Sequence, residues 1–161
     1  MKVLASKSTE NGGSEMSSVR VCLLLGSNIE PMKNLPKALG LLAKEVVILK
    51  RSSVWESTAI GSDGPDFLNA ALLIETTLTS EALKKNILAP IEQSLGRVRS
   101  SDKNAPRTID IDIVMYDEVV VDDELTDYDH IRLPVSEVVE GVTRPDPITL
   151  KHVPLPVWRI G

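Results

Sequence analysis

Asp110 and Asp112 stand one residue apart in the stretch from Pro106 to Tyr116, where polar and apolar residues alternate. Because side chains of a strand point in turn to its two faces, both aspartates are expected on one face, with Cα atoms about 6.6 Å apart. Two carboxylates this close repel each other, so either solvent screens them or cations bind between them. Mg²⁺ is the cation best suited to such oxygen ligands. The spacing predicts a candidate metal site on a half-buried strand.

Three arginines accompany the two aspartates. Arg107 lies three residues before Asp110, and Arg97 and Arg99 follow Gly96 at the end of a predicted helix. A guanidinium presents a fork of donors that suits phosphate oxygens. An Asp-x-Asp pair on an exposed strand is common and alone indicates little. Together with three arginines, however, it is typical of sites that bind a phosphate and a metal.

Composition and charge narrow the class of protein. A chain of 161 residues with 42% hydrophobic and 25% charged residues fits one globular domain, which we expect over 19–161, after a disordered tail at 1–18. The net charge of −5 argues against a nucleic-acid partner. No stretch resembles a membrane helix or a signal peptide, and the single Cys22 has no cysteine to pair with. These features predict a cytoplasmic protein with no membrane partner.

Hydrophobic periodicity predicts the elements that position this chemistry. The expected order is strand, helix, strand, strand, helix, strand, with Cys22 in a central strand buried on both faces and a kink at Pro90 in the second helix. On the last strand, Met115 should share the apolar face and Tyr116 the face of the aspartates. This order is that of an α+β, ferredoxin-like split βαβ sandwich, a four-stranded antiparallel-type sheet with helices packed on one face. Strands are expected at 19–25, 46–56, 68–77 and 108–116. One helix is expected to begin between residues 31 and 36, and a second to span about 79–96. The tail that follows is expected to be largely irregular, with a short strand at 118–121 and a helical turn at 135–139.

Four motifs then carry a resemblance to a known family. They are Gly26-Ser27-Asn28, Phe67-Leu68-Asn69, Gly96-Arg97-Val98-Arg99 and Pro106-Arg107-Thr108-Ile109-Asp110-Ile111-Asp112-Ile113. Over residues 19 to 126 the chain resembles hydroxymethyl-dihydropterin pyrophosphokinase of folate biosynthesis, whose fold is ferredoxin-like. The resemblance implies transfer of the terminal pyrophosphoryl group of ATP to the hydroxymethyl oxygen of a reduced pterin, with release of AMP.

The resemblance also assigns roles to residues. It implies that Asp110 and Asp112 hold two Mg²⁺ ions and that Arg97 and Arg107 are catalytic. The implied nucleotide-binding residues are Glu92, Arg97, Arg99, Lys103, Arg107 and Ile113. The implied pterin-binding residues are Ser57, Thr58, Ile60, Phe67, Asn69 and His130, with Phe67 stacking on the bicyclic ring and Asn69 bonding its amide-like edge.

The chain departs from the family pattern at several positions. Lys103-Asn104-Ala105 replaces an Arg-Trp-Gly run, Ala89 replaces a glutamine, and Ser57 and Ala59 replace Thr and Pro near the pterin. Only Asp127, Tyr128 and Asp129 separate Thr126 from His130, so the usual mobile loop is expected to be short and the site open. A second hypothesis therefore stays beside the enzyme: a diverged, noncatalytic ferredoxin-like module that binds a nucleotide or a protein partner.

Overall fold

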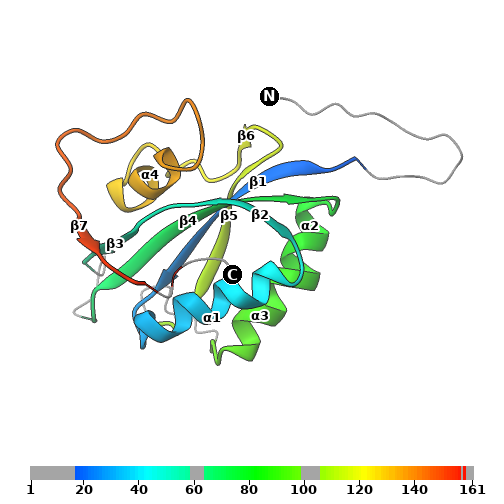
Figure 1. Ribbon diagram of the computed structural model, residues 1–161, viewed down its shortest axis with the longest axis horizontal. Coiled ribbons are helices and arrows are strands. Elements are labelled where there is room, and N and C mark those ends of the chain that lie inside the picture. Colours follow the sequence, from blue (N-terminus) through cyan, green and yellow to red (C-terminus); the bar gives the residue numbers. More distant parts are fainter. Residues whose placement is uncertain (1–16, 59–63, 99–105, 157, 159–161) are drawn as a thin grey trace, which may run out of the picture.

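The computed structural model describes residues 17–58, 64–98, 106–156 and 158. Of the predicted site residues, Ile60, Arg99 and Lys103 lie outside these ranges, as does most of the predicted N-terminal tail. Ser18, the last residue of that tail, donates a hydrogen bond to Glu75 (2.9 Å). The described residues form a seven-stranded antiparallel sheet with helices on both faces, so the α+β class predicted from the sequence is confirmed (Figure 1). The expected number of four strands was wrong, because one predicted strand is divided in two and two short strands extend the edges of the sheet.

Three long strands make the centre of the sheet. Strand β1 (Val19–Ser27) lies between β4 (Phe67–Thr76) and β5 (Asp110–Tyr116), antiparallel to both. Its odd-numbered side chains, such as Leu23, enter one hydrophobic cluster, and Cys22 and Leu24 enter another on the opposite face. The prediction of a central strand buried on both faces is therefore confirmed, and both faces of the sheet need a cover.

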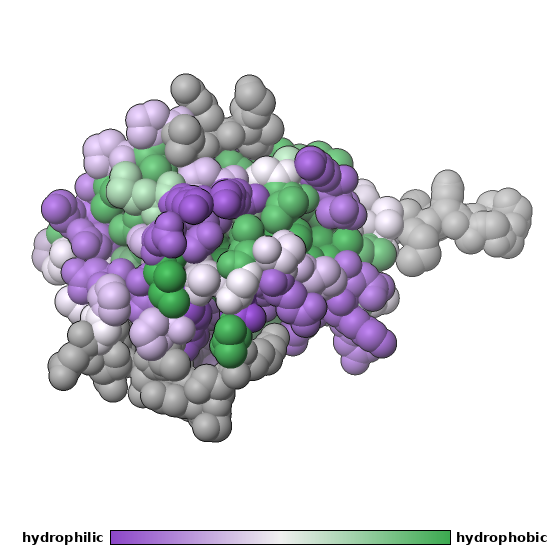
Figure 2. All heavy atoms as spheres, turned by 90° about the horizontal axis from the view of Figure 1, so that it is seen from below, coloured by the Kyte–Doolittle hydropathy of each residue, from purple (hydrophilic) through white to green (hydrophobic). Residues whose placement is uncertain are grey.

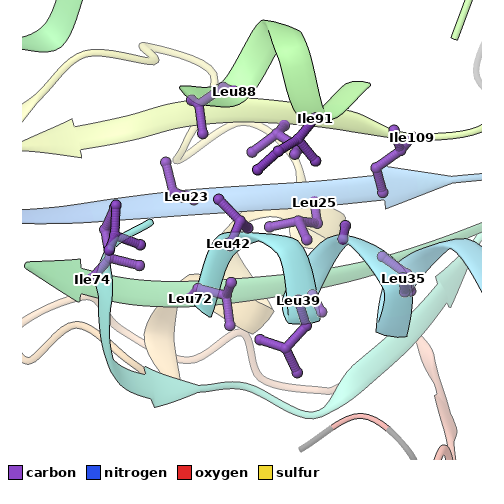
Figure 3. Packing of buried hydrophobic residues seen from close by; sticks show 14 of the residues in the cluster. Leu23, Leu25, Leu35, Leu39, Leu42, Leu72, Ile74, Leu88, Ile91 and Ile109 are labelled. Carbon is purple, nitrogen blue, oxygen red and sulfur yellow. The ribbon is translucent and has the colours of Figure 1, made fainter. Parts of the chain in front are cut away.

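Helices α1 and α2–α3 cover one face of the sheet. Helix α1 (Pro31–Ala43) packs beside a rod built from α2 (Ser80–Leu83), a π-helical turn η1 (Lys84–Leu88) and α3 (Ala89–Ser94). Thr79 caps the rod by accepting the N–H of Ala82 at 3.1 Å. Gly96 ends it with a positive φ of 87°, which glycine adopts freely. Figure 3 shows the leucine and isoleucine side chains of both helices meeting those of β1 and β4.

The outer face of this helical layer is seen in Figure 2, where hydrophilic and hydrophobic residues are intermixed. Within the described ranges, none of the helices has the length and apolar character required to span a membrane. The irregularity predicted near Pro90 is present as the π-helical turn η1, directly before that proline.

The opposite face carries an element that the sequence did not predict in full. Helix α4 (Asp129–Ser136) packs Ile131 and Val135 onto this face, where only a helical turn at 135–139 was expected (Figure 1). The expectation of helices on a single face was therefore wrong. A short amphipathic helix after a run of acidic residues gives a weak periodic signal, and Pro134 inside it weakens that signal further.

The single strand expected over 46–56 is two strands in the structure. Strand β2 (Val47–Arg51) and β3 (Val54–Ser57) both pair with β4, and they are separated at Ser52. The Ser52 side chain accepts the N–H of Ala71 at 2.7 Å, in place of a regular ladder bond. At the two edges, β7 (Lys151–Val153) pairs with β3, and β6 (Val119–Val120) pairs with β5.

A β-bulge corrects one prediction for β5. Between the pairs Leu23–Ile113 and Cys22–Met115, strand β5 has one extra residue, Val114. An extra residue reverses the alternation beyond it. Met115 therefore packs with the α4 cluster, and Tyr116 packs with the other cluster, where its hydroxyl donates to Leu78 O at 2.7 Å. The predicted faces of these two residues were wrong, and those of Asp110 and Asp112, which precede the bulge, follow the expected period.

Candidate active site

Asp110 and Asp112 lie where two pockets meet. On β5 they stand opposite Gly26 and Leu24 of β1, on the face that carries α4. The first pocket, of about 420 Å³, opens between β4, β5 and the α4 segment, and the second, of about 310 Å³, runs along the free edge of β5 beside η1 and α3. Both aspartates line both pockets. A molecule in each pocket would therefore meet its neighbour at these two carboxylates.

The first pocket gathers residues from five separate segments. Its lining residues are Leu24, Gly26, Ser57, Thr58, Phe67, Asn69, Arg107, Asp110, Asp112, Asp122, Glu124, Tyr128, His130 and Ile131. The second is lined by Lys84, Leu88, Ala89, Glu92, Arg97, Asp110, Ile111 and Asp112. The structure thus brings the predicted pterin residues, apart from Ile60, into one pocket. It brings Glu92 and Arg97 into the other.

Two arginines hold Asp110 from both sides. Arg97 Nη1 donates to Asp110 Oδ1 at 2.7 Å, and Arg107 Nη1 donates to Asp110 Oδ2 at 3.3 Å. Arg97 Nη1 also lies 3.1 Å from Glu92 Oε2. The same Glu92 oxygen accepts the N–H of Ile111 at 2.7 Å, so this carboxylate ties α3 to β5. Glu92 is 5% exposed, and its contacts make it a residue that positions Arg97.

Asp112 differs from Asp110, which is held by the two arginines. The pKa of Asp112 is raised to about 7 because the recess removes part of its hydration and because Asp110, Glu92 and Asp122 are negative neighbours. The side chain is nonetheless open to the two pockets. A divalent cation bound here would relieve this repulsion. Within the described ranges, no group of three or more histidine, cysteine or acidic residues has the arrangement of a metal site, so a cation would need further oxygen ligands from a substrate or water.

Asn28 fixes the position of Arg107. Its Oδ1 accepts the backbone N–H of Arg107 at 2.8 Å, and its own N–H donates to Arg107 O at 3.2 Å. Its Nδ2 donates to Pro65 O at 3.2 Å, so the same side chain also holds the segment before Phe67. Asn28 is 4% exposed. The sequence motif pointed to this residue only as part of a turn, and its role as a clamp depends on contacts between distant segments.

Ser57, Phe67 and Asn69 form one wall of the first pocket. Asn69 Nδ2 donates to Trp55 O at 3.1 Å and to Ser57 Oγ at 2.8 Å, so its amide is already oriented by β3. Arg107 lies over the Phe67 ring, 5.8 Å from its centre. A Cβ at Gly26 would stand 3.7 Å from both Asn69 Oδ1 and Phe67 Cδ1, so glycine keeps space between β1 and these side chains.

The α4 segment forms the opposite part of the pocket rim. His130 lies 5.4 Å, ring centre to ring centre, from Tyr128. Burial lowers the pKa of His130, against the raising effect of Asp122 and Asp129. Asp122, Glu124 and Tyr128 also line the pocket, and none of the three was predicted as a site residue. These residues follow β6, and they reach the site because the chain after β6 crosses the face of the sheet that carries Asp110 and Asp112.

Ile113 faces away from the two aspartates. Its side chain is buried in the helix-side cluster, away from the face of the aspartates, because it is offset from them by one residue. The nucleotide contact predicted for Ile113 would therefore come from its backbone. Its backbone groups point to the same free edge as those of Ile111, two residues before, so a backbone contact from Ile113 stays a prediction.

The fold and the site define an α+β domain with two adjoining pockets that share two aspartates, one of which is held by two arginines. Comparison with known proteins then assigns the family. Residues 22–140 match the model of the 7,8-dihydro-6-hydroxymethylpterin-pyrophosphokinase (HPPK) family, and the chain belongs to this family.

Several curated relatives carry the name 2-amino-4-hydroxy-6-hydroxymethyldihydropteridine pyrophosphokinase. One from Synechocystis is 39% identical over 57% of this chain and 48% of its own length, and one from Campylobacter jejuni is 37% identical over 66% and 69%. The Folic acid synthesis protein fol1 of Schizosaccharomyces pombe is 34% identical over 73% of this chain and 16% of its own length. The chain thus spans about half of the Synechocystis relative and a small part of fol1. A solved Plasmodium falciparum HPPK-DHPS is 14% identical, with a TM-score of 0.49 over 65% of this chain and 30% of that chain.

Proposed function

We propose that this chain transfers the pyrophosphoryl group of ATP to the hydroxymethyl oxygen of 6-hydroxymethyl-dihydropterin in folate biosynthesis. The hydroxyl oxygen forms a bond to the β-phosphorus, the bond from that phosphorus to the bridging oxygen of AMP breaks, and the hydroxyl proton is released. The products are AMP and the pterin diphosphate. Consumption of ATP fits the cytoplasmic location expected from the sequence.

One observation carries this proposal: two pockets adjoin, and the same two aspartates line both. A transfer between two substrates requires that the acceptor oxygen and the β-phosphorus meet, and holding them in place supplies much of the rate gain. If the pterin fills the first pocket and ATP the second, the reacting atoms meet beside Asp110 and Asp112. Arg97 reaches this junction from the nucleotide side and Arg107 from the pterin side.

The residues at the junction fit Mg²⁺. Asp110 and Asp112 offer carboxylate oxygens to a cation that prefers one or two carboxylates together with phosphate oxygens and water. When bound, Mg²⁺ would neutralise phosphate charge and lower the pKa of the attacking hydroxyl. The two ions implied by the family resemblance belong to this proposal, with Asp110 and Asp112 as the residues that would hold them.

The protein side chains supply the remaining chemistry. Arg97 and Arg107 present donors toward the phosphates and would stabilise charge that develops on the leaving AMP and on the transferred group. Glu92 pairs with the guanidinium of Arg97, and Asn28 holds the backbone of Arg107, whose guanidinium bonds Asp110, so both arginines are positioned before a substrate binds. Phe67 would stack on the pterin, Asn69 and Ser57 would face its polar edge, and His130 would cover it from the α4 side.

The acidic rim distinguishes the first pocket from the second. Asp122 and Glu124 line it beside Asp110 and Asp112, and Arg107 is the single arginine or lysine among its described lining residues. Such a rim repels phosphate and tolerates a neutral ring. This distribution of charge supports the pterin in the first pocket and the nucleotide in the second, and it supports an open site in which Asp127 and Asp129 add no phosphate donor.

The test is product analysis. The purified chain is incubated with ATP, Mg²⁺ and hydroxymethyl-dihydropterin, and AMP and the pterin diphosphate are separated and quantified. The proposal predicts equal amounts of both, and no AMP when the pterin is omitted. A chain that binds ATP and forms no AMP under these conditions would instead be the noncatalytic binding module.

A further inference from the structure

One wall of the second pocket is the π-helical turn η1. The N–H of Ala89 donates to the C=O of Lys84, a bond across five residues. Pro90 explains the wide turn, because it has no N–H and its ring would crowd the carbonyl of Asn86 in a regular α-helix. In an α-helix Ala89 would lie about 140° around the axis from Lys84. The π-helical turn brings Ala89 closer to the side of the helix that carries Lys84, and both line the pocket.

Lys84 lies at the far end of this pocket from the aspartates. Glu92, which pairs with Arg97 at the junction, lies eight positions further along the helical rod, so the two residues are about two turns apart. Between them the wall is formed by Leu88 and Ala89, whose side chains carry no hydrogen-bonding group. The ammonium of Lys84 is thus the side-chain donor at this end of the helical wall.

This ammonium is available to a ligand. Lys84 is exposed, and within the described parts of the chain its side chain has no hydrogen bond or ion pair. Lys85, the next residue, is also exposed, but it is not among the described residues that line the pocket. The helix therefore presents two adjacent lysines, one directed to the pocket and one not.

We infer that Lys84 binds the nucleoside part of the nucleotide. This inference rests on the proposed function, and it names a residue that recognises the ribose and base of ATP. With phosphates beside Arg97 and the aspartates, the ribose and base extend along Leu88 and Ala89 toward η1. A lysine ammonium only donates hydrogen bonds, so it matches acceptor nitrogens of the base and oxygens of the ribose. Lys84 shares this helix face with Leu88 and Glu92, and the π-helical turn adds Ala89 to the same wall.

The test compares two ligands and two lysines. Isothermal titration without pterin measures the Kd of Mg-ATP and of Mg-tripolyphosphate, which lacks a nucleoside, for the wild type, Lys84→Met, Lys84→Arg and Lys85→Met. We expect Lys84→Met to weaken ATP binding about tenfold and to change tripolyphosphate binding by less than about twofold. Lys84→Arg, which keeps a charged donor, should retain most of the ATP affinity. Lys85→Met should leave both ligands unaffected.

Three results would overturn the inference, each in a different way. If Lys84→Met loses the same affinity for ATP as for tripolyphosphate, Lys84 acts on the phosphates through its charge. Equal behaviour of Lys84→Met and Lys85→Met would show that the pocket wall has no special role, and the proposed function would stand. A wild-type chain that binds neither ligand would overturn the proposed function itself.

Discussion

Replacement of Asn28 by alanine tests whether the clamp on Arg107 matters for function as well as for stability. The change removes the acceptor of the Arg107 N–H and the donor to Pro65 O, both in a largely buried place. A buried polar group left without its partner costs about 1 to 3 kcal/mol, so the free energy of unfolding should fall by roughly 2 to 4 kcal/mol. Arg107 would also lose its fixed position beside Asp110, and kcat should fall by about tenfold or more.

The matched control is Asn34→Ala. Asn34 is also buried, and its Nδ2 donates to Ile29 O at 2.6 Å, but it does not contact Arg107. This variant should lose about 1 kcal/mol of stability and keep its kcat. Asn28→Asp keeps an acceptor for the Arg107 N–H and should lie between the wild type and Asn28→Ala. Urea unfolding and the AMP assay below the unfolding transition measure both effects. If Asn28→Ala and Asn34→Ala reduce kcat alike, or if neither does, the clamp has no specific role.

Three further predictions follow from the same geometry. Phe67→Ala should weaken pterin binding by about 1 to 3 kcal/mol in calorimetry while ATP binding stays unchanged, and a large loss of melting temperature with unchanged pterin affinity would make Phe67 a core residue. Burial lowers the pKa of His130 below its ordinary 6.5, so the unfolded chain binds more protons at this residue and the free energy of unfolding should fall as the pH drops below 6.5. His130→Gln should make this dependence of stability on pH less steep, and an unchanged dependence would contradict the buried imidazole. Burial raises the pKa of the Cys22 thiol to about 12, so a thiol reagent at pH 8 should label it only after denaturant is added, and rapid labelling of the native protein would contradict this.

The hydrophobic pattern sufficed for the elements nearest the chemistry. The apolar run at Leu23 and the alternation around Asp110 each produce a strong periodic signal, and both strands lie where that signal places them. Thr79 and Gly96 marked the ends of the second helical rod because a cap and a positive φ depend on local chemistry. Local patterns therefore predicted the position of both aspartates.

The remaining features depend on contacts between distant segments. The bulge at Val114, which exchanges the faces of Met115 and Tyr116, is visible only in the pairing of β5 with β1. The division of 46–56 at Ser52 rests on its bond to Ala71. The return of Asp122 and Glu124 to the pocket rim depends on β6 and α4, whose short segments carry weak periodic signals. No local rule in the sequence reports these three features.

The central claim is that the chemistry occurs at the carboxylates shared by the two pockets. The most direct measurement is the rate of pterin-dependent AMP formation in the wild type and in Asp112→Asn, over a titration of Mg²⁺, with circular dichroism to show that the fold persists. Asp112 is open to both pockets and its charge is repelled by its neighbours, so the amide should not reduce stability. We expect the wild type to require Mg²⁺ and Asp112→Asn to lose at least about a hundredfold in kcat. Near-wild-type turnover in the folded variant, with the same dependence on Mg²⁺, would contradict this assignment of the active site.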